Sequence, residues 1–197
     1  MAAIGIYGGT FDPVHAGHIT VAERAFNQCG LAKVLLIPAK NPWLKEGELI
    51  SEFNHRHRML EIAVQGRPGL EVSSIEGWRD GPTYTVDTVQ QLRDEDPEGE
   101  FVLVIGQDSM MTMPRWHRVE ELLTLCPLVV YKRDGEDTVD AERTITGLGG
   151  RISWIEGPLM EVSATSLRQL IAEGVDPGDR MPSSVYSYVQ QQGLYTG

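Results

Sequence analysis

Residues 8–18, Gly-Gly-Thr-Phe-Asp-Pro-Val-His-Ala-Gly-His, constrain the fold of this chain more than any other stretch. They follow a short apolar run at residues 4–7. They precede apolar residues at three- and four-residue spacing, which is typical of one face of a helix. A strand, a glycine pair and a helix in this order predict the first half of a nucleotide-binding βα unit.

The same stretch predicts a phosphate site. Gly8 and Gly9 would allow a tight turn with positive φ and leave backbone N–H groups open to a ligand. A helix that opens near Gly17 would direct its unpaired N–H groups and positive dipole end at the same place. His15 and His18 could then both donate to one cluster of oxygens. Because no Gly-Lys-Ser/Thr sequence follows, the stretch is not a Walker loop.

Plainer interpretations exist for each part of this stretch. A glycine pair after a strand is a common turn, and two nearby histidines can lie on a surface or bind zinc. Zinc would need a third ligand at recognisable spacing, but His55, His57 and His117 lie far along the chain. We therefore expect no metal site made by the protein itself.

Composition and length limit the binding partners, the location and the domain organisation that we expect. A formal net charge of −11 disfavours binding to nucleic acid or to a membrane surface. No apolar run is long enough to span a bilayer, no signal peptide is recognisable, and the two cysteines suggest a reducing compartment, so we expect a cytoplasmic protein. A length of 197 residues suits a single domain over residues 1–197. The sequence does not fix the oligomeric state, and a homo-oligomer is compatible with it.

Hydrophobic patterning predicts alternating strands and helices. Strands are expected at residues 4–7, 34–38, 70–75, 101–105, 128–131 and 152–155. Helices are expected from about residue 17, at 53–65, after Thr85 as N-cap, around 119–123, and at 163–172 and 184–192. Residues 132–150 are interpreted as a surface connection with room for a short helix. This alternation predicts an α/β fold, a doubly wound Rossmann-like domain with a mainly parallel sheet and helices on both faces.

Two further strings place polar groups near the predicted ligand edge of the sheet. Asp108 follows a buried strand and could accept hydrogen bonds from ribose hydroxyls. Trp116 offers a flat face to an aromatic ring, although a lone Trp more often packs under its helix. Residues 81–88 form a loop that leads into a helix N-terminus, which is a natural seat for an anion.

Basic and hydroxyl residues elsewhere add candidates for phosphate contacts. Ser163 and Thr165 lie at a helix start with Arg168 one turn later, which makes either a phosphate cradle or an N-cap beside a solvated arginine. Lys45 lies in the loop after the second predicted strand and is a candidate for binding phosphate. Lys40 is an alternative for that role, and either could be a surface lysine. Arg133, just past a strand end, is a phosphate-side or adenine-side candidate.

Residues 8–18 resemble the signature of the nucleotidyltransferase superfamily with a His-Xaa-Gly-His motif, and most closely its nicotinate-mononucleotide adenylyltransferase branch. Residues 81–88, residues 106–109 with Trp116, and residues 162–168 resemble further strings of that branch, with Leu167 where the family has Ile. Residues 181–195 resemble its last helix and tail. The loop at residues 41–45 departs from the family's Pro-Pro-His-Lys form, since Trp43 and Leu44 replace the middle positions.

The resemblance implies transfer of the adenylyl group of ATP to nicotinate mononucleotide, with Mg²⁺ carried in by ATP. Siblings that use nicotinamide mononucleotide or phosphopantetheine, and a binding module without turnover, are the alternatives. A hydride-transferring Rossmann enzyme is disfavoured because the Gly-Xaa-Gly-Xaa-Xaa-Gly spacing is missing. The implied roles are catalysis by His15 and His18; ATP and phosphate binding by Gly8, Gly9, Thr10, Phe11, Lys45, Ser163, Thr165, Arg168 and Arg133; ribose binding by Gly106 and Asp108; and nicotinate binding by Thr85, Trp116 and the main chain of His117.

Overall fold

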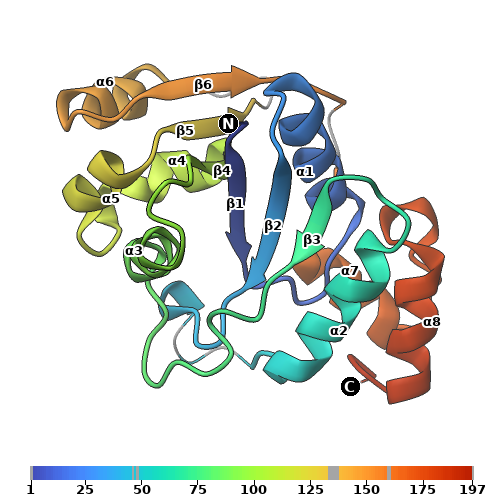
Figure 1. Ribbon diagram of the computed structural model, residues 1–197. Helices are drawn as coiled ribbons and strands as arrows, with labels where there is room; N and C mark the ends of the chain where they lie inside the picture. The colour runs from blue at the N-terminus through green and yellow to red at the C-terminus, as the bar shows by residue number, and fades with distance from the viewer. Residues whose placement is uncertain (1, 46, 48, 133–137, 159–160, 197) are drawn as a thin grey trace.

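The protein folds around one six-stranded sheet in which every strand is parallel to its neighbours (Figure 1). The computed structural model describes residues 2–45, 47, 49–132, 138–158 and 161–196. The sheet has the order β3-β2-β1-β4-β5-β6. The strands are β1 Ile4–Gly9, β2 Lys33–Pro38, β3 Leu70–Val72, β4 Phe101–Gly106, β5 Leu128–Tyr131 and β6 Ile152–Ile155.

Helices cover both faces of the sheet, as Figure 1 shows. One apolar cluster joins the sheet to α1, α2, α7 and α8, and a second joins its other face to α3, α4, α5 and α6. The predicted α/β fold is therefore confirmed. The helices are α1 Ala16–Gln28, α2 Phe53–Val64, α3 Thr85–Glu95, α4 Gln107–Thr112, α5 Val119–Leu125, α6 Val139–Gly147, α7 Ala164–Ala172 and α8 Ser183–Gln192.

The order of the strands places a topological switch between β1 and β4. The chain builds outward from β1 through β2 to β3, and then returns to pair β4 on the other side of β1. Ile4 lies opposite Phe101 in that pair, so Gly9 and Gly106 end neighbouring strands at the same edge. Ligands of open parallel sheets bind in the crevice at such a point.

The predicted positive φ at Gly8 and Gly9 is wrong. Both residues belong to β1 and pair with Ile37 and Pro38 of β2, which keeps them extended. The left-handed backbone lies instead at Phe11, where φ is +50°. The glycines therefore serve the site by lacking side chains.

The predicted N-cap at Thr85 is also wrong. Tyr84 is the N-cap of α3, with φ −107° and ψ 137°, and its carbonyl accepts from the N–H groups of Asp87 and Thr88. Thr85 is the first helical residue, so its hydroxyl does not cap the helix. Sequence patterning also missed α4, and β3 ends earlier than predicted, at Val72.

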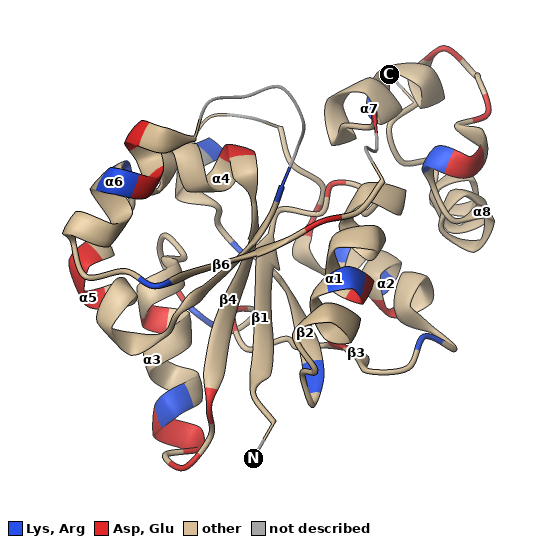
Figure 2. Ribbon diagram, turned by 90° about the horizontal axis from the view of Figure 1, so that it is seen from above, with Lys and Arg blue, Asp and Glu red and all other residues tan. Residues whose placement is uncertain are grey.

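Acidic residues are spread over the outer helices α3, α5 and α6 (Figure 2). Within the described residues, no helix combines the length and the apolar character needed to cross a bilayer.

Candidate active site

Two cavities flank the carboxyl ends of β1 and β4. The first, called here the α7 cavity, measures about 330 Å³ and reaches Ser163 and Ala164 at the start of α7. The second, called the α3 cavity, measures about 250 Å³ and reaches Thr85 at the start of α3. Both are also lined by Tyr7, Gly8, Gly9 and Ser109. A ligand that fills both cavities therefore crosses the end of β1.

Gly8 and Gly9 keep that crossing clear for different reasons. A Cβ atom on Gly8 would meet no atom within 4 Å, so it would project into open space between the two cavities. A Cβ atom on Gly9 would lie 3.0 Å from the ring of Phe11. Any side chain at position 8 would thus occupy ligand space, whereas one at position 9 would press on the core.

His15 and His18 are fixed by reciprocal bonds to the backbone at the start of α1. The Nδ1 atom of His15 accepts from the N–H of His18 at 3.4 Å, and the Nδ1 atom of His18 accepts from the N–H of His15 at 3.2 Å. Because each Nδ1 is an acceptor, the proton of each neutral ring sits on Nε2. Both residues line the α7 cavity.

The packing around the two rings explains the residues between and beneath them. The rings stack with centroids 3.6 Å apart and planes 24° apart. A Cβ atom on Gly17 would lie 3.1 Å from the His15 ring, so a glycine there allows the ring its position. Phe11 is 2% exposed, and its ring packs edge-on against the ring of His18, with the ring centroids 4.8 Å apart. The Phe11 side chain therefore supports the histidines from the core and lines neither cavity.

Three helices begin around the α7 cavity. Their N-cap residues, His15 of α1, Gly106 of α4 and Ser163 of α7, all line it. The backbone N–H groups and positive dipole ends of helix N-termini favour anions. Exposed Asp108 also lines this cavity, so the structure brings together the predicted histidines, the predicted ribose residues and Ser163.

The remaining basic and hydroxyl candidates of this region lie further out. Thr165 is exposed, and neither it nor Arg168 lines the α7 cavity. Arg168 donates through Nη1 to the backbone carbonyl of Asp12 at 2.7 Å, and its Nη2 lies 3.4 Å from the Thr165 hydroxyl. The predicted site residue Arg133 lies outside the described residues.

Aromatic and hydroxyl side chains line the α3 cavity. Thr85 and half-buried Trp116 lie on its walls with Thr10. His117 does not line it, and its ring stacks on Tyr84 with centroids 4.1 Å apart. The structure therefore brings Thr85 and Trp116 together, as predicted, and leaves the side chain of His117 outside.

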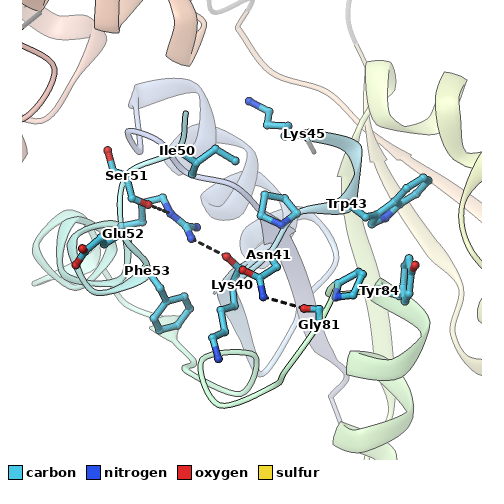
Figure 3. A pocket seen from close by; sticks show the side chains of 13 residues that line it. Lys40, Asn41, Trp43, Lys45, Ile50, Ser51, Glu52, Phe53, Gly81 and Tyr84 are labelled. Carbon is cyan, nitrogen blue, oxygen red and sulfur yellow. Dashed lines mark hydrogen bonds between the residues drawn. The ribbon is translucent and has the colours of Figure 1, made fainter. Parts of the chain in front are cut away.

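The two competing lysines occupy different places (Figure 3). Lys45 lines the α3 cavity and also an adjoining cavity of about 620 Å³, whose lining residues come from residues 40–45, 50–56 and 81–84. Lys40 lines only the adjoining cavity and lies 3.9 Å from the carboxylate of Asp80. Of the two, Lys45 is the one near the end of β1, and it lies on the α3 side of it.

A buried arginine that sequence reasoning missed holds the loops of the site together. Arg56 is 1% exposed and donates to the backbone carbonyls of Ser51, Thr10, Ala39 and Lys40 at 2.7–3.2 Å. It thus ties the residue after the glycine pair to the loop after β2. Burial lowers the pKa of Arg56, and nearby Asp12 opposes that shift. In sequence, Arg56 looked like one more polar residue of a predicted helix.

A second missed residue is Glu76, which is 6% exposed and lines the α3 cavity. Burial raises the pKa of its carboxyl group, and hydrogen bonding to Thr88 and the charge of Arg79 oppose that shift. Nothing in the local sequence pattern marked Glu76 as buried. Ser109, Tyr7 and Tyr131 also line the cavities without having been predicted.

The described residues contain no group of three or more His, Cys, Asp or Glu side chains that could hold a metal ion. Single carboxylates such as Asp108 are present at the α7 cavity. A magnesium ion that keeps most of its ligands from phosphates and water fits such a donor set.

Comparisons with known proteins place the chain in one family. The sequence model described as cytidylyltransferase-like matches residues 6–170. A probable nicotinate-nucleotide adenylyltransferase of Roseiflexus sp. (strain RS-1) is 40% identical over 196 residues, which cover 98% of each chain. Another probable nicotinate-nucleotide adenylyltransferase, from Aeromonas salmonicida (strain A449), is 39% identical over 98% of this chain and 97% of its own.

Among solved structures, the fold is similar to that of Plasmodium falciparum nicotinic acid mononucleotide adenylyltransferase complexed with NaAD. The TM-score is 0.83 at 20% identity, and the match covers 99% of this chain and 98% of that one.

Proposed function

The chain belongs to the cytidylyltransferase-like family, among its nicotinate-nucleotide adenylyltransferases, and from this membership we infer how its site works. The protein transfers the adenylyl group of ATP to nicotinate mononucleotide, which gives deamido-NAD and pyrophosphate in NAD biosynthesis. The observation that carries the residue-level proposal is the meeting of two cavities at Gly8 and Gly9, where His15 and His18 line one of them.

Each cavity suits one substrate. We place ATP in the α7 cavity, where Gly106 and Asp108 would bind the ribose and the N-termini of α1 and α7 would bind phosphates. Nicotinate mononucleotide would fill the α3 cavity, with its ring on Trp116 and its carboxylate near Thr85. The acceptor's 5′-phosphate and the α-phosphorus of ATP would then meet over Gly8.

The chemical step needs positioning more than proton transfer. An oxygen of the acceptor's phosphate, already an anion near neutral pH, would attack the α-phosphorus as the bond to pyrophosphate breaks. The Nε2–H groups of His15 and His18 would donate to the oxygens on which charge develops. Rigid backbone bonds at both Nδ1 atoms hold these donors in place, which lowers the cost of reorganisation during the reaction.

The basic residues would act around that centre. Lys45 lies on the α3 side, which favours contact with the acceptor's phosphate or the α-phosphate over the β- and γ-phosphates. Arg168 and Thr165 would reach the outer phosphates only if Arg168 releases the carbonyl of Asp12. When bound with ATP, Mg²⁺ would neutralise charge on the phosphates. Because both substrates are intracellular metabolites, we propose a cytoplasmic location.

Pyrophosphate release tests the proposed function. The protein would be incubated with ATP and Mg²⁺ and, in parallel, with nicotinate mononucleotide, nicotinamide mononucleotide or phosphopantetheine. We expect strong release with the nicotinate compound and much weaker release with the other two. Release with another acceptor alone would overturn the proposed α3 pocket, and binding of ATP without release under any condition would favour a binding module.

A further inference from the structure

The α3 cavity carries two buried polar atoms that lack partners. Among the described residues, Glu76 Oε2 and Trp116 Nε1 are both fully buried and make no hydrogen bond. Both residues line the α3 cavity. Leaving a buried acceptor or donor unpaired is costly, and such groups in a folded protein call for an explanation. A polar ligand in this cavity would supply the missing partners.

The free oxygen of Glu76 lies at the start of α3. Its other oxygen, Oε1, accepts from the hydroxyl of Thr88 at 2.6 Å, and that hydroxyl accepts from Arg79 at 2.9 Å. Thr88 is three residues after Thr85, in the first turn of α3. The carboxyl group is therefore beside the helix turn where the nicotinate carboxylate is proposed to bind, and Oε2 is the oxygen left for a ligand or a proton.

The surroundings of Glu76 act in opposite directions on the pKa of its carboxyl group. The cations that face it are Arg79 from its own turn and Arg56 from α2. The Thr83 hydroxyl, which donates to the backbone carbonyl of Asn41, and the Lys40 backbone N–H lie near the carboxyl group without forming a hydrogen bond of good geometry to it, and their dipoles also favour the ionised form. The Lys40 side chain is turned to Asp80 instead. Burial acts in the opposite direction and is the dominant cause of a raised pKa.

A second carboxylate in the cavity would favour the protonated form of Glu76, because two carboxylates that share a buried site do not both stay ionised. We propose that Glu76 takes one proton from solvent when the nicotinate carboxylate enters the α3 cavity, and that Oε2–H then donates to a carboxylate oxygen. This inference rests on the proposed function. A nicotinamide amide carries no charge, so it can donate its N–H to ionised Oε2 without proton uptake. Glu76 thus couples the choice between acid and amide to pH. Because only the acid requires the extra proton, the preference of the α3 cavity for the acid weakens as pH rises.

Calorimetric titration of the wild-type protein tests the proton directly. Binding of nicotinate and nicotinamide mononucleotide would be measured in two buffers of different ionisation enthalpy at several pH values from 6 to 9. Both ligands share the ribose, the 5′-phosphate and the pyridinium ring. Protons bound or released by those groups therefore contribute equally to both ligands and cancel in the difference. We expect the acid to take up more protons than the amide, approaching one extra proton as pH rises. The ratio of their affinities would then fall up to tenfold per pH unit. Equal proton uptake by both ligands would overturn the inference.

The Glu76→Gln variant provides the second test. Its amide is neutral at every pH and keeps an N–H donor near the position of Oε2, so acid binding should persist while the extra proton and the pH dependence of the ratio disappear. Glu71→Gln, at an exposed glutamate of β3 paired with Lys33, should behave as wild type. An extra proton that survives in Glu76→Gln would overturn the inference.

If Glu76→Gln fails to fold, the wild-type proton count decides alone. Pyrophosphate release separates this inference from the reaction itself. Release from nicotinate mononucleotide without an extra proton overturns only the role of Glu76, and no release with that acceptor overturns the proposed function.

Discussion

At the scale of single residues, the two histidines show how a backbone contact can fix a side chain's chemistry. The Nδ1 atoms of His15 and His18 are occupied by each other's N–H groups, so Nε2 of each ring is the protonated donor. Neither ring is arranged as a base that must collect a proton, which agrees with an attacking phosphate that is already ionised.

We predict that His18→Ala lowers kcat roughly 100- to 1,000-fold, as loss of a positioned donor to a transition-state oxyanion does. The variant should keep the far-ultraviolet circular dichroism of the wild type. His57→Ala serves as the control because His57 lies on α2 beside Glu61 and lines none of the cavities described above. Near-normal turnover by folded His18→Ala would remove His18 from the mechanism.

Gly8→Ala should separate activity from stability. The added methyl group meets no protein atom, and its backbone is not in the left-handed region, so the free energy of unfolding should be unchanged or slightly higher. Because the methyl group occupies the crossing between the cavities, kcat/KM should fall roughly 100-fold. Gly147→Ala, at an equally open position at the end of α6, should leave activity intact. Equal activity of the two variants would argue against substrate phosphates at Gly8.

At the scale of the elements, the sequence predicted the buried strands and long amphipathic helices best. Residues 101–105 form an unbroken apolar run, and the structure has the buried strand β4 there. The six-residue helix α4 was missed because it is too short to show a helical period. Local propensity placed the N-cap at Thr85, whereas the backbone of Tyr84 performs that role without a side-chain bond.

Site residues that belong to a sequence motif could be predicted. Site residues that are recognisable only because they are buried in the fold could not. The motif at residues 8–18, Asp108, Thr85, Trp116 and Ser163 could be proposed from the sequence. The structure brings the last four to the two cavities, together with Gly8, Gly9, Thr10, His15, Gly17 and His18 of the motif, whereas Phe11 lies beneath them in the core. Glu76 and Arg56 could not, because a charged residue becomes buried only through contacts with distant segments. The sequence also could not show that Lys45 lies on the α3 side of the site, because its place depends on how the loop after β2 folds.

The C-terminal tail is tied to the same motif. The hydroxyl of Tyr195 donates to Asp12 Oδ1, and the backbone N–H of Ser51 donates to Oδ2. Asp12 is 2% exposed. Burial and then the neighbouring Asp12 carboxylate raise the pKa of Tyr195, so its hydroxyl stays a donor through the neutral pH range. The residues just before α1, the loop before α2 and the tail after α8 therefore meet at one carboxylate.

Removing that hydroxyl should cost stability. We expect Tyr195→Phe to lower the free energy of unfolding by about 1.5–3 kcal/mol, since it leaves a buried carboxylate oxygen short of a partner. Denaturant unfolding measures this difference. Tyr186→Phe is the matched control, because the hydroxyl of Tyr186 on α8 makes no hydrogen bond to the described residues. Equal stability of the two variants would show that the contact with Asp12 contributes nothing measurable.

At the scale of the whole molecule, an acidic protein must attract two anionic substrates. Its net charge is −11, and acidic residues are spread over α3, α5 and α6 (Figure 2). The attraction is therefore local. The N-termini of α1, α4 and α7 converge on the α7 cavity, and the buried cation Arg56 binds the backbone carbonyl of Thr10, the residue after the glycine pair.

That residues 1–197 form a single domain stays a prediction. One sheet with an apolar cluster on each face favours cooperative unfolding. We therefore expect one calorimetric transition in which the calorimetric and van't Hoff enthalpies agree. Saturating ATP should raise its midpoint. Two resolved transitions, one of them insensitive to ATP, would instead indicate two independent units.

A crystal structure of the protein with deamido-NAD tests the central claim most directly, because that product fills both substrate sites at once. We predict the adenosine in the α7 cavity beside Asp108, the nicotinate ring against Trp116 in the α3 cavity, and the diphosphate over Gly8 within hydrogen-bond reach of His15 and His18. A diphosphate bound away from Gly8, or a nicotinate ring outside the α3 cavity, would contradict this account of the site.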